Sequence, residues 1–112
     1  MRNPINAVSD TLIATGLAEA VRDITVQDAV NPRKWTVRFE SKNNALIRSF
    51  LVVEVIEEDD GDASVCVLRR FNVSRRAMIR IMNTLVDQLD DEPRLAEPLV
   101  PPPGGAPPEP QQ

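Results

Sequence analysis

The spacing of apolar side chains first predicts a helix near the amino end of the chain. Apolar positions between Ile5 and Ile13 recur at the three- and four-residue intervals of an amphipathic helix. The dipeptide Asn3-Pro4 favours a helix start, because asparagine caps the first turn and proline fits its first position. We expect this helix to run from about Pro4 to Thr15 and to stop at Gly16. The sequence also allows the helix to continue to Ala20, because the residues before Ala20 are good helix formers.

Period-two alternation then predicts strands. Ile24 and Val26 alternate with polar positions between Val21 and Gln27, which indicates a half-buried strand with these two side chains on its apolar face. The clearest strand runs from Lys34 to Glu40, with polar side chains on one face. The other face of that strand carries Trp35, Val37 and Phe39, which we expect in the core.

Two further strands are expected on either side of an acidic hairpin. The run from Arg48 to Glu57 is apolar on both of its faces. This predicts a central strand that is covered on both sides, or one with an edge-protected second face. Asp60-Gly61 predicts the hairpin turn, and Ala63 to Phe71 is expected to pair back as the last strand. Cys66, which lies within that last strand, is expected to be a small buried core residue.

A second amphipathic helix is expected at the carboxyl end of this region. Ser74 is its predicted cap, and the helix should reach about Leu89. Its predicted apolar stripe contains Met78, Met82, Leu85 and Leu89, flanked by Ile79 and Val86. The order of elements predicts an α+β fold, a small antiparallel β-meander of three or four strands flanked by an N-terminal and a C-terminal helix.

The composition changes abruptly after this helix. Eight of the ten prolines lie between Pro93 and Pro110. Proline lacks an amide donor and favours extended polyproline II, so such a stretch builds no core. We therefore expect one α+β domain over residues 1–92 and a disordered proline-rich tail over residues 93–112.

The residue types that are missing exclude many chemistries. The chain contains no histidine and no tyrosine, which removes imidazole acid–base catalysis and histidine metal sites. Its single cysteine excludes an internal disulfide and a thiolate metal cluster. We expect a non-enzymatic protein with no catalytic residue, no cofactor and no metal. A lone cysteine, no signal-peptide pattern and no apolar run of about 20 residues favour a cytoplasmic protein without a membrane span.

The charges are unevenly distributed, and the basic ones suggest a candidate site. The net charge of −4 disfavours a nucleic-acid partner. However, five arginines with no acid among them fall within twelve residues around the predicted start of the second helix. They are Arg69, Arg70, Arg75, Arg76 and Arg80. Because helix N-terminal amides bind anions, this arginine cluster is our candidate for binding an acidic protein segment, a carboxylate or a phosphate.

Acidic residues are expected to gather at the opposite end of the domain. Six lie between Glu54 and Asp62, and four more lie between Asp87 and Glu92. The last strand spans roughly 26 Å and the second helix roughly 24 Å. An antiparallel helix would therefore bring Asp87 back to the acidic hairpin. The result would be a charge dipole that could orient a charged partner or promote contacts between copies, including a homodimer.

These features together predict a protein-binding adaptor or accessory module. Its compactness and its use of eleven arginines against two lysines suggest a bacterial or phage protein. The alternative is nucleic-acid or anion binding through the cluster from Arg69 to Arg80. The element order between Ile5 and Leu89 also resembles small bacterial secretion-chaperone-like domains, as element order only. That resemblance implies a dimeric, partner-binding protein and transfers no individual residues.

Overall fold

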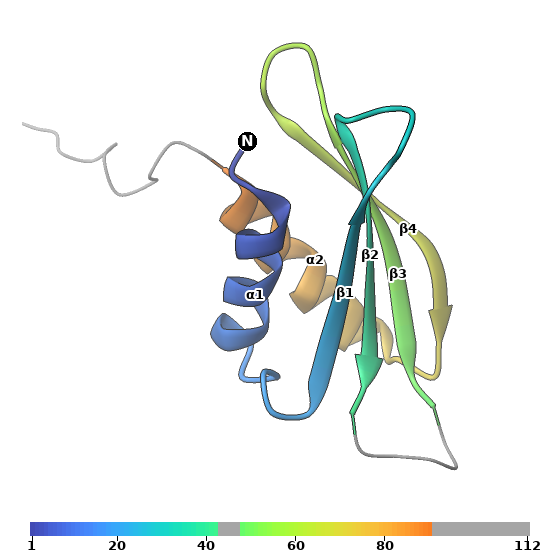
Figure 1. Ribbon diagram of the computed structural model, residues 1–112. Helices are drawn as coiled ribbons and strands as arrows, with labels where there is room; N and C mark the ends of the chain where they lie inside the picture. Colours follow the sequence, from blue (N-terminus) through green and yellow to red (C-terminus); the bar gives the residue numbers. More distant parts are fainter. Residues whose placement is uncertain (43–47, 91–112) are drawn as a thin grey trace, which may run out of the picture.

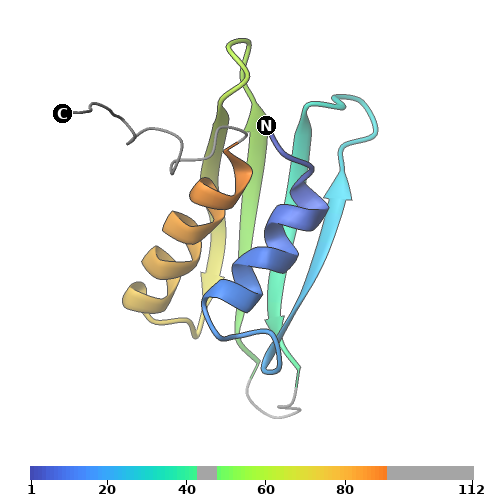
Figure 2. The same ribbon diagram turned by 90° about the vertical axis from the view of Figure 1, so that its left-hand side faces the viewer.

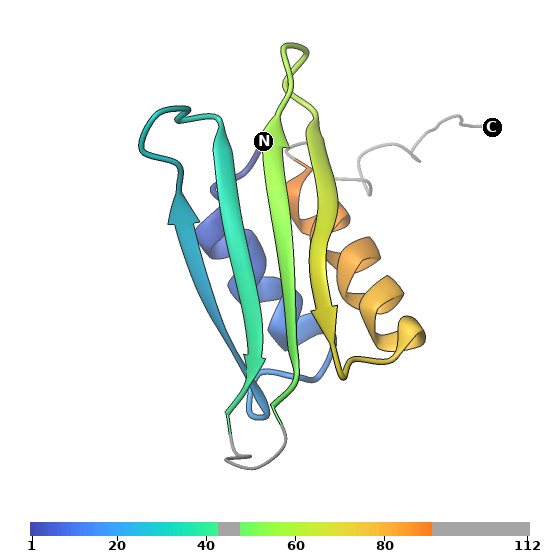
Figure 3. The same ribbon diagram turned by 90° about the vertical axis from the view of Figure 1, so that its right-hand side faces the viewer.

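A computed structural model of the chain describes residues 1–42 and 48–90. Within them, two helices lie on one face of a four-stranded antiparallel sheet (Figure 1 and Figure 2). No described helix covers the other face (Figure 3). The elements are α1 (Pro4–Ala14), β1 (Val21–Gln27), β2 (Lys34–Ser41), β3 (Phe50–Glu57), β4 (Ala63–Phe71) and α2 (Arg75–Leu89). The predicted α+β meander is confirmed, while the predicted proline-rich tail, 93–112, lies outside the described residues.

The strands follow one another across the sheet in chain order, each antiparallel to its neighbour. The pairing of β3 with β4 contains one irregularity. Val52 lies opposite Arg69, whereas Val53 lies opposite Val67, so Leu68 is the extra residue of a β-bulge. An extra residue moves every later side chain of the strand to the other face.

Local sequence signals explain where α1 begins and ends. The Asn3 side chain accepts a hydrogen bond from the Ile5 amide at 2.9 Å, which confirms the predicted cap. At the other end Gly16 adopts a left-handed φ of 75°, and the Leu17 amide donates to the Leu12 carbonyl at 2.8 Å. This Schellman arrangement ends the helix, so the alternative of a helix that continues to Ala20 is wrong.

Helix α2 also begins as predicted, but its buried stripe differs in detail. The Ser74 hydroxyl accepts a hydrogen bond from the Ala77 amide at 3.1 Å. Ile81, which was not in the predicted stripe, is buried. The predicted flanking residues Ile79 and Val86 are exposed, because the helix turns them away from the sheet.

The core lies between the two helices and the covered face of the sheet (Figure 1). The predicted apolar face of β2 points into it, with Val37 and Phe39 buried and Trp35 packed against them. The other buried apolar residues are Ala7, Val8, Leu12, Leu51, Val53, Val55, Ile81, Leu85 and Leu89. Each of them comes from α1, β3 or α2, so one layer of side chains joins the helices to the sheet.

Two predictions about strand faces are wrong, and for β3 only the alternative of cover on both sides fails. Ile24 and Val26 of β1 lie on the uncovered face, 46% and 56% exposed, because they pair with the outward-facing positions of β2. Cys66 is exposed as well, since it lies opposite Glu54 on that face rather than in the core. Strand β3 is central, but the helices cover only one of its two faces.

The two ends of the domain carry opposite charge, as the chain lengths predicted. The Met1 ammonium lies 3.7 Å from the Glu57 carboxylate and donates to the Gly61 carbonyl at 3.3 Å. The Arg2 amide donates to the Leu89 carbonyl at 3.0 Å. These contacts place the end of α2 beside the acidic hairpin. Its start, with the arginine cluster, therefore lies at the opposite end of the sheet.

Candidate functional site

The uncovered face of the sheet carries exposed apolar side chains from both edge strands. Ile24 and Val26 supply them on β1, while Leu68 and Phe71 supply them on β4, about half exposed in each case. Between the edges, β3 adds further half-buried apolar side chains. This surface spans the width of the sheet, and the sheet face is the one drawn in front in Figure 3.

An aromatic and arginine cluster marks one end of this face. The rings of Phe50 and Phe71 stack with centroids 5.5 Å apart and planes at 21°. The Arg38 guanidinium lies 4.5 Å from the centroid of the Phe50 ring, and that of Arg69 lies 5.4 Å from it. Guanidinium groups over aromatic faces are attracted by the ring quadrupole. The cluster therefore holds two guanidinium groups against the aromatic rings.

The β-bulge at Leu68 creates this cluster. Strict alternation from Val65 and Val67 would place residues 69 and 71 on the covered face of β4. The bulge reverses that pattern, so that Arg69 lies opposite Val52 and Phe71 lies opposite Phe50. Bulges often re-aim side chains near functional sites.

Ion pairs fix the remaining charges of the uncovered face. The Glu40 carboxylate accepts hydrogen bonds from Arg38 at 2.7 Å and from Arg22 at 2.8 Å. These bonds, that from Arg38 first, lower the pKa of Glu40. The Lys34 ammonium lies 3.1 Å from the Glu54 carboxylate, and this hydrogen bond raises the pKa of Lys34. The Glu40 carboxylate thus pairs with two guanidinium groups, so the Phe50 end of the face keeps an excess of positive charge.

The predicted arginine cluster lies at one end of the domain but spreads over different faces. Arg69 faces outward beside Phe50, whereas Arg70 lies opposite Leu51 and belongs to the covered side of the edge strand. The other three are exposed on the first turns of α2: Arg75, Arg76 and Arg80. Within residues 1–42 and 48–90, none of the five forms an ion pair. They form a basic end without one converging centre.

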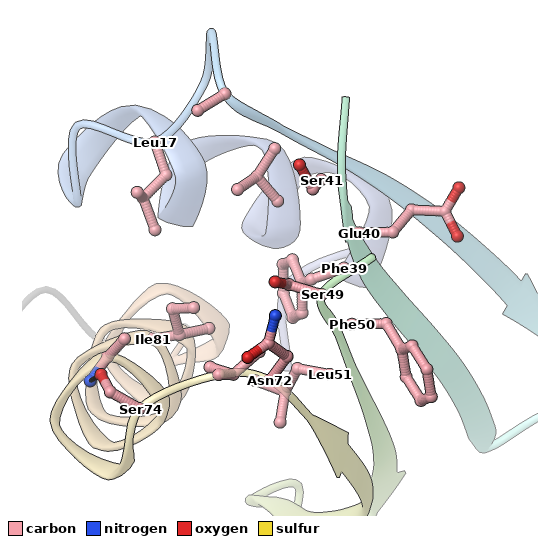
Figure 4. A pocket seen from close by; sticks show the side chains of 14 residues that line it. Leu17, Phe39, Glu40, Ser41, Ser49, Phe50, Leu51, Asn72, Ser74 and Ile81 are labelled. Carbon is pink, nitrogen blue, oxygen red and sulfur yellow. Dashed lines mark hydrogen bonds between the residues drawn. The ribbon is translucent and has the colours of Figure 1, made fainter. Parts of the chain in front are cut away.

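A pocket of about 300 Å³ opens at this same end, on the helix side of the sheet. Its walls come from the connection after α1, the ends of β2 and β3, and the start of α2. Figure 4 shows Leu17, Phe39 and Ile81 around it, while the side chains of Glu40 and Phe50 point to the other side of the sheet. The pocket is therefore largely apolar and separate from the Phe50 cluster.

The acidic end offers no metal site in the described part of the chain. No group of three or more carboxylate or thiol side chains there is arranged to hold a metal ion. Asp28, near that end, has a lowered pKa because the Asn31 and Val30 amides donate to its carboxylate. This carboxylate caps a turn.

Sequence reasoning missed both Phe50 and Phe71, as well as the pocket. The signal for Phe50 was present, because the run from Arg48 to Glu57 is apolar on its second face too.

No described helix is long and apolar enough to cross a membrane. No protein-family model matches the chain, and neither the curated proteins nor the solved structures contain a significant match.

Proposed function

We propose that the protein is a non-enzymatic binding module that holds another protein on the uncovered face of its sheet. The observation that supports this is the set of apolar side chains without cover: Ile24, Val26, Leu68 and Phe71. Four strands about 4.8 Å apart and roughly 25 Å long present a face of roughly 500 Å². The apolar side chains share this face with ion-paired charges, and exposed apolar patches that gather on one face of a small protein are commonly interaction sites.

The charges favour an acidic partner surface. Arg69 lies beside Phe50 on this face without an ion pair among the described residues, and Arg38 shares the Glu40 carboxylate with Arg22. A partner that supplies carboxylates near Phe50 would gain from both cations and be oriented by the charge dipole. The role is that of a cytoplasmic adaptor or accessory protein of bacterial or phage type. A secretion-chaperone-like binder or a homodimer would be particular forms of it.

The test compares two matched double variants. Leu68→Ser with Phe71→Ser removes apolar surface from the uncovered face, while Ile79→Ser with Val86→Ser removes similar exposed surface from α2. Each is used to capture partners from a lysate of the source cells, and the captured protein is then purified and titrated by calorimetry. We expect the α2 variant to bind like the original chain and the sheet variant to bind at least about tenfold more weakly. Equal binding by both variants would contradict the proposal.

Nucleic-acid binding is the second candidate, and the Phe50 cluster favours it. An exposed aromatic ring on a sheet, such as that of Phe71, can stack single-stranded bases when arginines lie near it. A labelled 50-residue RNA or DNA, titrated at 50 mM and 200 mM salt, separates the two functions. Phosphate binding should be clear at low salt and fall steeply with added salt. Without a shift at 50 mM salt, this candidate is discarded.

A further inference from the structure

The pocket at the basic end combines an apolar interior with a polar mouth. Leu17, Phe39 and Ile81 bring apolar side chains to the pocket, whereas Ser49 and the exposed Asn72 bring polar ones (Figure 4). In the described part of the chain, the side chains of Ser49 and Asn72 form no hydrogen bond with protein groups. Ligand sites commonly pair an apolar lining with a few such polar groups. The chemistry of the pocket suits an apolar group attached to a polar chain.

Two cations neighbour lining residues in the chain on the strand side of the pocket. Lys42 follows the pocket-lining Ser41, and its ammonium donates to the Ala18 carbonyl at 2.9 Å, on the connection that forms another wall. Arg48 directly precedes Ser49, which also lines the pocket, and its side chain is exposed. Neither cation has an ion pair among residues 1–42 and 48–90.

Two more cations stand beside the mouth on the helix side. Arg76 and Arg80 each precede a pocket-lining residue of α2, Ala77 and Ile81 respectively. Because they are four positions apart, they form one row along the helix beside the pocket. Both are exposed, and neither is paired within the part of the chain described.

The acids near the pocket do not balance these four cations. Glu40 belongs to the lining, but its carboxylate lies on the other side of the sheet, bound to Arg38 and Arg22 (Figure 4). Glu19 lies on the connection between the lining residues 17 and 20 and is exposed. In the described part of the chain, four cations thus neighbour the lining, against two carboxylates on this side of the sheet, those of Glu19 and of Asp23, which lies opposite Phe39.

We propose that this pocket receives one bulky apolar side chain from an acidic linear segment of a partner protein. A volume of about 300 Å³ holds a leucine, methionine or phenylalanine side chain and is at the lower limit of small-molecule sites. The cations extend over two strand ends and two turns of α2, further than one small carboxylate reaches. An acidic chain on either side of the apolar residue matches that extent. This inference rests on the proposed function only in that both require a protein partner, and the pocket is a contact separate from the sheet face.

The test uses the full chain and synthetic probes. The first probe is a fluorescein-labelled nine-residue peptide of alternating aspartate and glutamate with a central leucine. In the second probe serine replaces the leucine, and in the third lysine replaces every acid. Fluorescence polarisation at 50 mM and 200 mM salt measures binding. Changes in the amide NMR shifts of the ¹⁵N-labelled chain show where the peptide binds.

We expect the leucine peptide to bind about tenfold or more tightly than the serine peptide, because only leucine fills the apolar interior. The lysine peptide should not bind, and added salt should weaken the leucine peptide. Ala77→Leu should remove the advantage of leucine by filling the pocket, whereas Ala29→Leu in the opposite hairpin should not. Arg80→Glu should weaken binding more than Arg75→Glu, whose side chain lies on the other side of α2.

Several results would overturn the inference. Equal binding of the leucine and serine peptides means that only charge is recognised. If Ala77→Leu distorts the fold, the amide shifts of the original chain with the leucine peptide provide the test. Unchanged amide shifts at Leu17, Ala77 and Ile81 would contradict binding in the pocket. If removing residues 91–112 by itself shifts those amides, the chain's own tail is the occupant and not a partner.

The two proposals fail in distinguishable ways. Suppose that the Leu68→Ser, Phe71→Ser variant loses the captured partner while Ala77→Leu retains full affinity for it. The sheet-face function then stands and the pocket inference is wrong. Suppose instead that Ala77→Leu loses the partner and the sheet variant does not. Then the pocket inference stands, and the sheet face is not the binding surface.

Discussion

Leucine-to-alanine changes on the two faces of the sheet should have very different effects on stability. Leu51 of β3 lies on the covered face and is 1% exposed, whereas Leu68 of β4 lies on the uncovered face and is 49% exposed. Leu51→Ala removes buried apolar volume next to the pocket at the basic end, and core changes of this kind cost about 2–5 kcal/mol. At Leu68→Ala, half the side chain already contacts water and no closed cavity remains. We expect a loss of about 1 kcal/mol or less there, from the burial of a partly exposed leucine.

Urea unfolding followed by the fluorescence of Trp35, the single tryptophan, measures both changes. A domain of this size unfolds with a slope of roughly 1–1.5 kcal/mol per molar urea. A loss of about 3 kcal/mol then lowers the midpoint by roughly 2–3 M for Leu51→Ala, against less than about 1 M for Leu68→Ala. Equal shifts, or a larger shift for Leu68→Ala, would refute the assignment of the covered and uncovered faces.

Three further outcomes follow from particular contacts. Cys66, exposed on the uncovered face, should react with Ellman's reagent in the native chain at nearly the rate seen in urea, whereas reaction only on unfolding would place it in the core. Because the pKa of Glu40 is lowered from its ordinary value of 4.5, its contribution to stability is complete above that value and lost as pH falls through the folded-state pKa. Glu40→Gln should therefore flatten the loss of urea stability between about pH 5 and 3, and an unchanged pH dependence would contradict this. Gly16→Ala should cost about 1–2 kcal/mol in urea unfolding, through its positive φ alone, since the added methyl group meets no atom within 4 Å; an unchanged midpoint would contradict this.

The candidate site was only partly predictable. The arginine-rich sequence from Arg69 to Arg80 marked the correct end of the domain, since its charges are local in the chain. Phe50 and Phe71 are 21 positions apart, and only the β3–β4 pairing brings their rings together. The pocket joins four separate segments of the chain, so no local pattern could reveal it.

The sequence by itself determined the elements and their ends. Asn3, Gly16 and Ser74 act on the backbone within five residues, through a cap, a left-handed turn and a second cap. The alternation of polar and apolar side chains along Lys34–Ser41 is likewise visible within one strand, without knowledge of its partners in the sheet. Helix and strand boundaries were therefore predictable, because the hydrogen bonds that fix them are local.

Only the tertiary structure decided which face of each strand meets the helices. Ile24, Val26 and Cys66 obey the same alternation as core residues, yet their partners across the sheet place them outside. The extra residue at Leu68 then turns Phe71 from the covered to the uncovered face. A period of two fixes which side chains share a face, but the hydrogen-bonding register between strands and the position of both helices determine which face is buried.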